Sequence, residues 1–339
     1  MAEIFLTSKG GEEGGEEEIK GPERGDFRFQ EVYFQQPDLD TIGVFFLHRL
    51  ARLCAPDVPL RLSRGDVNED ILNNRRILCI EVGGSGQVEK GNFDHHGKGA
   101  PQESATLQAF KNLPELQKNP LLESLVNYIN ELDTLGPSEM VAKRGKPPFP
   151  TLSDIIAGVR LKHSQDFVEA MKKGVEVLEK IIETRQDPYG TISGFEEYAE
   201  IKRENDRKVE EVKEKIQWAR TNEGLIVGAV ESTFPGSLGA IYEAGKEKFG
   251  KGEVIIGVVL NPAFGPEKMR KFTIGLSLSP EEAKEEGINL TEAAGKLNEK
   301  EPGWGGPPTG TIIGSPRQGT NLSLEEVTKI VKENLKSEK

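Results

Sequence analysis

The pattern of apolar and polar residues divides the chain into an α/β first part, a charged helical middle and an α/β last part. Apolar positions 42, 45, 46, 50 and 53 predict a helix over 42–53, and positions 121, 122, 125, 126, 129 and 132 predict another over 121–132. A short helix is expected around 66–72. Continuous or alternating apolar runs predict strands at 4–7, 27–34, 58–62 and 77–82.

The middle of the chain is dense in charge. Residues 153–220 are mostly helical in pattern, and 195–220 interleave Glu and Lys at helical spacing, which is typical of a solvated connector helix. From residue 225 the period changes again, and strands at 225–229, 254–260, 272–276 and 311–314 alternate with helices at 238–249, 290–299 and 324–335. We therefore expect a domain over 1–150, a helical connector over 151–222 and a smaller α/β domain over 223–339.

Composition narrows the class of protein. The formal net charge of the 339 residues is −12, with 56 acids against 44 bases, so nonspecific binding to duplex DNA is disfavoured and any nucleic-acid contact must come from a local basic patch. Cys54 and Cys79 lie in apolar runs and predict buried free thiols rather than a disulfide framework. Because no stretch resembles a signal peptide or a membrane span, we expect a cytoplasmic protein with no membrane partner.

Candidate functional residues are most concentrated in the segment NFDHHG, residues 92–97. Adjacent histidines on an extended segment point to opposite sides, so one of them could bind a metal while its neighbour faces a substrate or a second shell. Just upstream, the apolar run 77–84 reads as a buried strand that delivers Glu81 into a glycine turn. An acid at the carboxyl end of a strand, beside a second loop with Asp-His-His, is typical of sites in open α/β sheets. A chance pair of surface histidines is the alternative.

Further acids flank this segment. Asp38 and Asp40 follow the strand at 27–34, and on an extended loop both carboxylates would project the same way. Asp40 or Thr41 is expected to cap the next helix, although capping explains one aspartate and not two. Asp133 lies at the carboxyl end of an apolar helix, where a negative charge opposes the helix dipole and favours a bound cation.

Two glycine-rich segments, 302–308 and 314–320, flank the last expected strand. Such loops let backbone N–H groups converge on an anion, and an arginine adds a fork for phosphate, although a turn-rich linker explains the loops equally well. The candidate phosphate contacts are Gly305, Gly306, Gly314, Ser315 and Arg317. The remaining histidines, His48 and His163, are expected to be ordinary packed or surface residues.

The chain carries Pro-Asp-Leu-Asp, then a strand that ends in an acid, then Asp-His-His and finally a later Asp. In this order the features resemble those of the DHH phosphoesterase superfamily. That superfamily includes manganese-dependent pyrophosphatases, single-strand exonucleases and oligoribonucleases. Within that superfamily the chain is similar to the melanocyte-proliferating-gene family of DHH-type metal-dependent hydrolases and exonucleases. Three features carry this similarity: the run EVGG followed by FDHHG, residues 129–136, and Trp304-x-Gly followed by GTIIGSPRQGT. The resemblance implies a DHH-type metal-binding catalytic domain with a parallel sheet, a helical connector and a smaller phosphate-binding domain.

The resemblance also implies roles for individual residues. His96 would face the substrate phosphate, and Asp94 would orient a histidine from behind it. Two departures stand out, because the first histidine of the family would fall at Phe34 and the bridging aspartate is a glutamate. One divalent ion would be held by Asp40, Glu81, His95 and Asp133, and a second by Asp38 and the bridging Glu81.

These features predict a hydrolase in which metal-activated water cleaves a phosphodiester, in short single-stranded RNA or a small nucleotide. Oxygen ligands with one imidazole favour one or two Mn²⁺ or Mg²⁺ ions over zinc. A catalytically impaired protein that binds a metal or nucleotide without turnover is the first alternative, favoured by Phe34. An inorganic pyrophosphatase is a further one, disfavoured because the last domain shows Arg317 but no dense basic cluster. A homodimer is left open.

Overall fold

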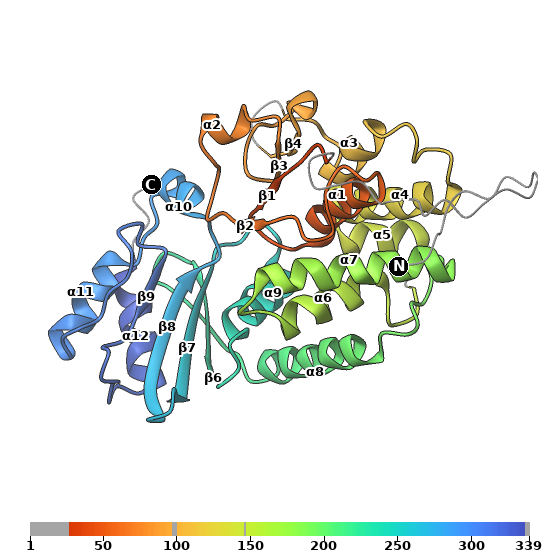
Figure 1. Ribbon diagram of the computed structural model, residues 1–339. Helices are drawn as coiled ribbons and strands as arrows, with labels where there is room; N and C mark the ends of the chain where they lie inside the picture. The colour runs from red at the N-terminus through yellow and green to blue at the C-terminus, as the bar shows by residue number, and fades with distance from the viewer. Residues whose placement is uncertain (1–26, 97–99, 146, 336–339) are drawn as a thin grey trace, which may run out of the picture. The chain divides into compact units, whose positions relative to one another are not determined.

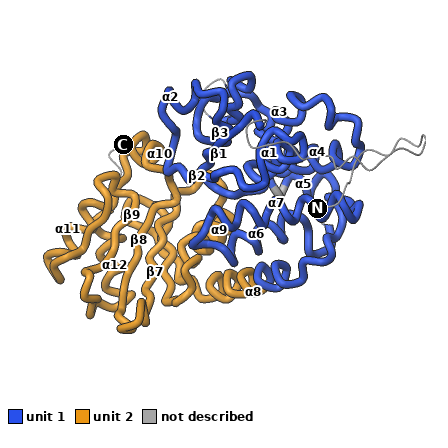
Figure 2. The backbone as a smooth tube through the Cα atoms, viewed as in Figure 1, with its two compact units in different colours: residues 1–203 blue, residues 204–339 orange. Residues whose placement is uncertain are grey.

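The computed structural model describes residues 27–96, 100–145 and 147–335. The chain separates into two compact units, residues 1–203 and 204–339 (Figure 2). The expected connector over 151–222 is thereby shared between the units, because its residues up to 203 belong to the first. The strand expected at 4–7 lies outside the described residues.

Unit 1 contains a four-stranded sheet in which every pairing is parallel, in the order β2-β1-β3-β4 (Figure 1). The strands expected at 27–34, 58–62 and 77–82 are present but shorter. Parallel strands bring their carboxyl ends to one edge of the sheet, so the loops after β1, β3 and β4 are neighbours. The strands are β1 (Glu31–Phe34), β2 (Leu60–Leu62), β3 (Ile77–Ile80) and β4 (Asn92–Phe93).

The helices of unit 1 pack around this sheet and share one hydrophobic core with it. Helices α6 (Leu152–Lys162) and α7 (Phe167–Thr184) lie within the expected connector, yet Ile155, Val175 and Leu178 on these helices are fully buried in that core. The helices are α1 (Leu39–Leu50), α2 (Glu69–Leu72), the short 3₁₀ turn η1 (Val88–Lys90), α3 (Ala105–Lys111), α4 (Pro120–Leu135), α5 (Pro137–Arg144), α6 (Leu152–Lys162) and α7 (Phe167–Thr184).

Helix α1 begins earlier than its apolar spacing suggests. The expected cap at Asp40 or Thr41 is wrong, because Asp38 is the N-cap and its Oδ1 accepts a hydrogen bond of 2.9 Å from the Thr41 N–H. The expectation that Asp38 and Asp40 share an extended loop is wrong for the same reason. Capping by Asp38 places Asp40 inside the first helical turn, where free N–H groups and the dipole stabilise a carboxylate.

Unit 2 is a mixed five-stranded sheet in the order β5-β6-β7-β8-β9, in which only β6 and β7 pair in parallel. Separate apolar clusters form around α9 and around α11 with α12. The elements are β5 (Gln217–Arg220), β6 (Ile226–Glu231), α9 (Ser237–Phe249), β7 (Ile255–Phe264), β8 (Met269–Leu276), α10 (Pro280–Glu286), α11 (Thr291–Lys300), β9 (Ile312–Gly314) and α12 (Leu324–Asn334).

The connector helix ends sooner than expected. Helix α8 spans Glu196–Lys213, and the residues Gln217–Arg220, expected to continue it, instead form β5 against β6. The reason is tertiary: Trp218 packs its ring on Phe249, with centroids 5.2 Å apart, so the strand gains an apolar contact that an isolated helix would lack.

Both cysteines are buried free thiols, as the sequence predicts. Burial raises the pKa of Cys54 and of Cys79 to about 12, so neither is poised as a nucleophile. No helix in the described part of the chain is long and apolar enough to cross a bilayer.

His48 is a packed core residue on α1. Its ring lies between Phe29 and Phe93, with centroid separations of 5.4 and 5.0 Å, and its Nδ1–H donates to the Val44 carbonyl at 2.8 Å. Burial lowers the pKa of His48 to about 4, and the charge of Arg28 acts in the same direction. Between pH 6.5 and about 4 the unfolded chain therefore binds a proton at His48 that the folded chain does not.

We expect this histidine to make folding pH-dependent. Its contribution is complete above the unfolded pKa and is lost as pH falls towards 4, up to about 3 kcal/mol over that interval. A His48→Phe variant keeps an aromatic ring but cannot titrate, so its stability should fall less on acidification. Urea denaturation of both proteins across this pH range, followed by circular dichroism, measures the difference. Parallel stability curves would contradict the assignment.

Candidate metal centre

The candidate site lies at the carboxyl edge of the unit 1 sheet. Asp38 and Asp40 follow β1, Glu81 follows β3, and the two adjacent histidines follow β4. The Glu81 N–H donates to the Phe93 carbonyl at 2.9 Å, which ties the end of β3 to the end of β4. Residues far apart in the sequence are therefore neighbours because their strands are neighbours.

His95 is the centre of this cluster. Its Nε2 atom lies 3.1 Å from Glu81 Oε1, 3.2 Å from Asp133 Oδ2 and 3.9 Å from Asp40 Oδ2. Asp133 comes from the last turn of α4. The structure thus brings together the four residues to which the resemblance assigns one ion, and their role as ligands stays a prediction.

Asp40 is held by the start of α3. Its carboxylate is buried, with Oδ2 accepting from the Ala105 N–H and Oδ1 from the Thr106 N–H, each at 2.8 Å. The Thr106 hydroxyl donates in turn to the Asp40 carbonyl at 2.7 Å. A Cβ at Gly43 would lie 2.3 Å from that hydroxyl oxygen, so glycine permits the close approach of the two helices. Sequence reasoning missed this support, and the only local signal is the helix start at Ser104.

Glu81 has a strained backbone. Its φ is 53°, in the left-handed region that a residue with a side chain rarely adopts, at a cost of about 1–3 kcal/mol. Gly83 and Gly84 continue the turn with φ of 99° and 77°. The turn is closed onto the next loop, because the Gly83 N–H donates to Asp94 Oδ2 at 2.8 Å.

The two histidines do not point to opposite sides, which corrects the expectation for an extended segment. Their ring centroids are 4.4 Å apart. Strand β4 ends at Phe93, and the His96 N–H then donates to Asp94 Oδ1 at 2.7 Å, an Asx-type turn that bends the chain. Both rings therefore lie on the same side of the segment.

Asp94 also orients His96. Its Oδ1 lies 3.2 Å from His96 Nδ1, which favours a proton on Nδ1 and leaves Nε2 for other partners. Asp94 is buried, whereas 68% of the His96 side chain is exposed. The structure therefore shows the aspartate beside an outward-facing histidine, as the resemblance implies, while the phosphate contact of His96 stays a prediction.

The pKa shifts in the cluster all indicate that negative charge is concentrated there and that a positive charge would be stabilised. Burial and the charge of Glu81 raise the pKa of Asp38 to about 7, and the same two causes raise the pKa of Asp40. Burial and the charge of Asp40 raise the pKa of Asp133 to about 6. The contact with Glu81, then the charges of Asp133 and Asp40, raise the pKa of His95 to about 9 despite desolvation. Crowded acids favour a cation among them.

The donor atoms fit a divalent ion. Atoms each about 2.1 Å from one ion lie about 3.0 Å apart at a right angle and about 4.2 Å apart when opposite. The separations of 3.1, 3.2 and 3.9 Å around His95 Nε2 fall within this range. This nitrogen is buried and makes no hydrogen bond. Among the residues that the structure describes, two sets of three have donor atoms close enough to share an ion. These are Glu81 with His95 and His96, and Asp40 with His95 and Asp133.

Phe34 adds no ligand to this site. It is the last residue of β1, fully buried and paired with Leu62 on one side and Ile80 on the other. An aromatic ring offers a cation no lone pair comparable to that of imidazole. The residues that the resemblance assigns to the second ion therefore stay Asp38 and Glu81.

The glycine segments of unit 2 form a paired structure. Gly305 and Gly314 exchange backbone hydrogen bonds of 3.1 and 2.8 Å, and Ser315 bonds Phe272 through both its N–H and its hydroxyl oxygen. Three of the N–H groups expected to bind an anion are thus already donated to carbonyls of the chain, because the loops align as strands.

The other two candidates of these segments differ from the paired ones. A Cβ at Gly306 would lie 2.0 Å from the Ile312 carbonyl oxygen, so glycine is needed there for close packing of the chain. Arg317 is exposed, and its carbonyl accepts a hydrogen bond of 2.6 Å from Lys271 Nζ. Its guanidinium remains the candidate phosphate contact in unit 2.

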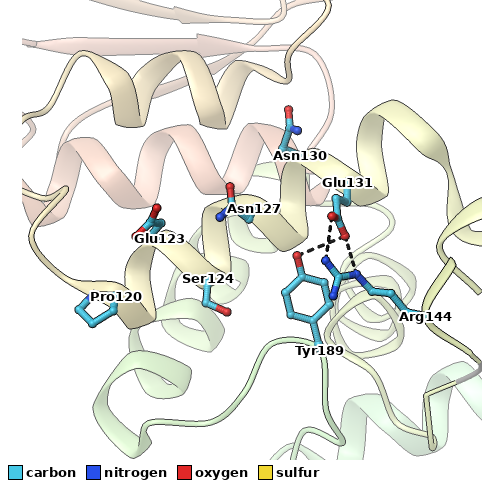
Figure 3. Close-up of a pocket in the computed structure, with 8 residues that line it drawn as sticks. All are labelled: Pro120, Glu123, Ser124, Asn127, Asn130, Glu131, Arg144 and Tyr189. Carbon is cyan, nitrogen blue, oxygen red and sulfur yellow. Dashed lines mark hydrogen bonds and ion pairs between the residues drawn. The ribbon is translucent and has the colours of Figure 1, made fainter.

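A separate polar pocket of about 400 Å³ lies on the outer side of α4 (Figure 3). Glu131 accepts two hydrogen bonds of 2.8 Å from Arg144, whose guanidinium lies 4.2 Å above the Tyr189 ring. The charges of Glu131 and Arg144 are paired with each other. Together with Tyr189, these side chains connect α4 and α5 to the loop after α7, which is a structural role. It is lined by Pro120, Glu123, Ser124, Asn127, Asn130, Glu131, Arg144 and Tyr189.

Comparison with solved structures shows a likeness in fold. No protein-family model and no curated protein matches the chain. A solved structure described as the DHH domain of a member of a family of ribosomal proteins is similar, with a TM-score of 0.47 and 16% sequence identity. The match covers 89% of this chain and 85% of the other.

We expect His95→Ala to remove most of the bound metal, because it deletes the nitrogen at the centre of the acid cluster. The protein would be loaded with Mn²⁺, desalted and measured by elemental analysis. His163→Ala is the matched control, since His163 ends α6 and lies in neither set of candidate ligands. Equal metal content in the wild-type and His95→Ala proteins would show that the cluster is not the metal site.

Proposed function

We propose that this protein is a metal-dependent phosphoesterase of the DHH superfamily that cleaves a phosphodiester with water. The observation that carries the proposal is the cluster of carboxylates around His95 Nε2, with a second histidine beside it that faces outwards. The order of its residues along the chain follows the superfamily pattern. Short single-stranded RNA or a small nucleotide is the proposed substrate.

The donor set supports Mn²⁺, with Mg²⁺ as the second choice. Asp40, Glu81 and Asp133 offer hard oxygen atoms, and the single imidazole of His95 shifts the preference from Mg²⁺ towards Mn²⁺. Bound there, the ion would lower the pKa of a coordinated water and supply the attacking group. We assign a second ion to Asp38 and Glu81, with Glu81 shared between the two.

The remaining steps fall to side chains. Asp94 holds the imidazole of His96 by Nδ1, so that a protonated Nε2 can donate to a phosphate oxygen or to the leaving oxygen. The crowded acids around His95 would repel an anionic substrate without neutralisation, which explains why binding of substrate should follow binding of metal. Arg317 is proposed to add a guanidinium to the phosphate.

A non-catalytic protein is the second candidate, and Phe34 favours it. Without the histidine of the family pattern, the second ion has only Asp38 and Glu81 from the chain. Such a protein would bind a metal or a nucleotide without turnover. An inorganic pyrophosphatase is the third candidate, and it is disfavoured because the glycine segments of unit 2 carry only one arginine.

A panel of substrates with Mn²⁺ separates these candidates. We expect hydrolysis of bis-p-nitrophenyl phosphate and of short RNA or a cyclic dinucleotide. His96→Asn should lower kcat by roughly 10²–10⁴-fold, as expected for loss of an acid or base, while His163→Ala leaves it unchanged. Cleavage of pyrophosphate alone would favour the pyrophosphatase. Metal binding with no turnover of any compound would favour the non-catalytic protein.

Arg317→Ala should weaken the binding of a phosphate-bearing ligand without changing metal content. The loss of a charge-assisted hydrogen bond corresponds to about 1.5–3 kcal/mol. Arg220→Ala is a matched control, because Arg220 is an exposed arginine on β5, at the opposite edge of the same sheet from β9. Calorimetric titration with AMP in the presence of Mn²⁺ measures the effect. Unchanged affinity in Arg317→Ala would rule out the contact.

A further inference from the structure

Thr41 links two acids of the candidate metal centre. It is fully buried in the first turn of α1. Its N–H donates to Asp38 Oδ1 at 2.9 Å, and its hydroxyl donates to Glu81 Oε2 at 3.0 Å. The first bond is ordinary helix capping, but capping does not explain the second, which joins α1 to the loop after β3.

The hydrogen bond from the Thr41 hydroxyl gives the two carboxylate oxygens of Glu81 different surroundings. With Oε2 held by Thr41, Oε1 is the oxygen that lies 3.1 Å from His95 Nε2 and 3.7 Å from His96 Nδ1. A glutamate has one more rotatable bond than an aspartate and loses more side-chain freedom when it is fixed. Its left-handed backbone at φ 53° and the Thr41 bond together determine where the carboxylate lies.

We propose that Thr41 is a positioning residue of the metal centre. It holds the Glu81 carboxylate so that Oε1 faces the histidines, and it aligns this carboxylate with that of Asp38. The two acids then form a preorganised pair, which is what an ion with few other ligands from the chain requires. The inference rests on the metal centre of the proposed function but not on phosphodiester cleavage.

The residue type suits this role. Threonine is restricted at χ1 because it is β-branched, and complete burial further limits the directions that its hydroxyl can take. Valine has nearly the same shape but cannot donate a hydrogen bond, and serine can donate but lacks the methyl group. The pair of substitutions therefore separates the hydrogen bond from the packing.

Titration calorimetry with Mn²⁺ on the full chain tests the proposal. Loss of a partner that orients a ligand typically weakens metal affinity by about 10–100-fold, so we expect at least a tenfold rise in Kd for Thr41→Val. Thr41→Ser should restore most of the affinity. Thr184→Val is the matched control, because the exposed Thr184 hydroxyl at the end of α7 donates to the Lys180 carbonyl and accepts from Gln186 Nε2, so it bonds no residue of the metal centre.

Thermal unfolding separates positioning from a role in folding alone. Measured in EDTA, the Tm reports the fold, and the rise in Tm on adding Mn²⁺ reports the metal centre. We expect Thr41→Val to lose much of the Mn²⁺-induced rise. A lower Tm in EDTA with unchanged Mn²⁺ affinity would overturn the proposal, as would failure of Thr41→Ser to recover binding.

The outcome for the proposed function can be read separately. If the wild-type protein binds no Mn²⁺, the metal centre itself is refuted, and both proposals fall. If it binds Mn²⁺ and Thr41→Val weakens that binding, the role of Thr41 stands even when no phosphodiester is cleaved. Activity assays on the same preparations decide the second point.

Discussion

The buried carboxylate of Asp40 holds the candidate site together. A buried carboxyl group needs hydrogen-bond partners in place of water, and the first turn of α3 provides two N–H donors and a favourable dipole. The same helix holds the next loop, because Gln108 Nε2 donates to the Asp94 carbonyl at 3.2 Å. Helix α3 therefore fixes the acid after β1 and the Asp-His-His segment after β4 with one rigid element. Displacing α3 would uncover a charge and release the histidines together.

The site is locally unfavourable and is sustained by its surroundings. Several acids share a small volume, and Glu81 adopts a backbone conformation that costs about 1–3 kcal/mol. Neighbouring strands, the Thr41 hydroxyl and the Gly83–Asp94 bond hold this arrangement in place. Such conflicts between local preference and global structure are concentrated at functional sites, where a ligand relieves them. A divalent cation among these acids would do so.

The geometry also limits which residues could serve as ligands of a second ion. Phe34 belongs to the core of unit 1, and the loop after β1 offers Asp38, whose Oδ1 also caps α1. A carboxylate has a further oxygen and further lone pairs, so capping and coordination are compatible. Glu81 is one methylene longer than the aspartate that the resemblance leads one to expect, and its Oε2 accepts a hydrogen bond from the Thr41 hydroxyl.

Apolar periodicity and short motifs were enough to predict the α/β class, the strands of unit 1, the buried thiols and the residues that gather at the site. These features are local properties of the chain, so they can be recognised without a structure. Three others could not be predicted in this way: Asp40 turns towards α3, the two histidines face the same side, and residues 217–220 form a strand. Asp40 and the strand at 217–220 depend on hydrogen bonds or packing between segments distant in sequence, which no local pattern encodes. The histidines face one side because an Asx-type turn ends the extended segment. The Asp-His-His motif alone does not predict that turn.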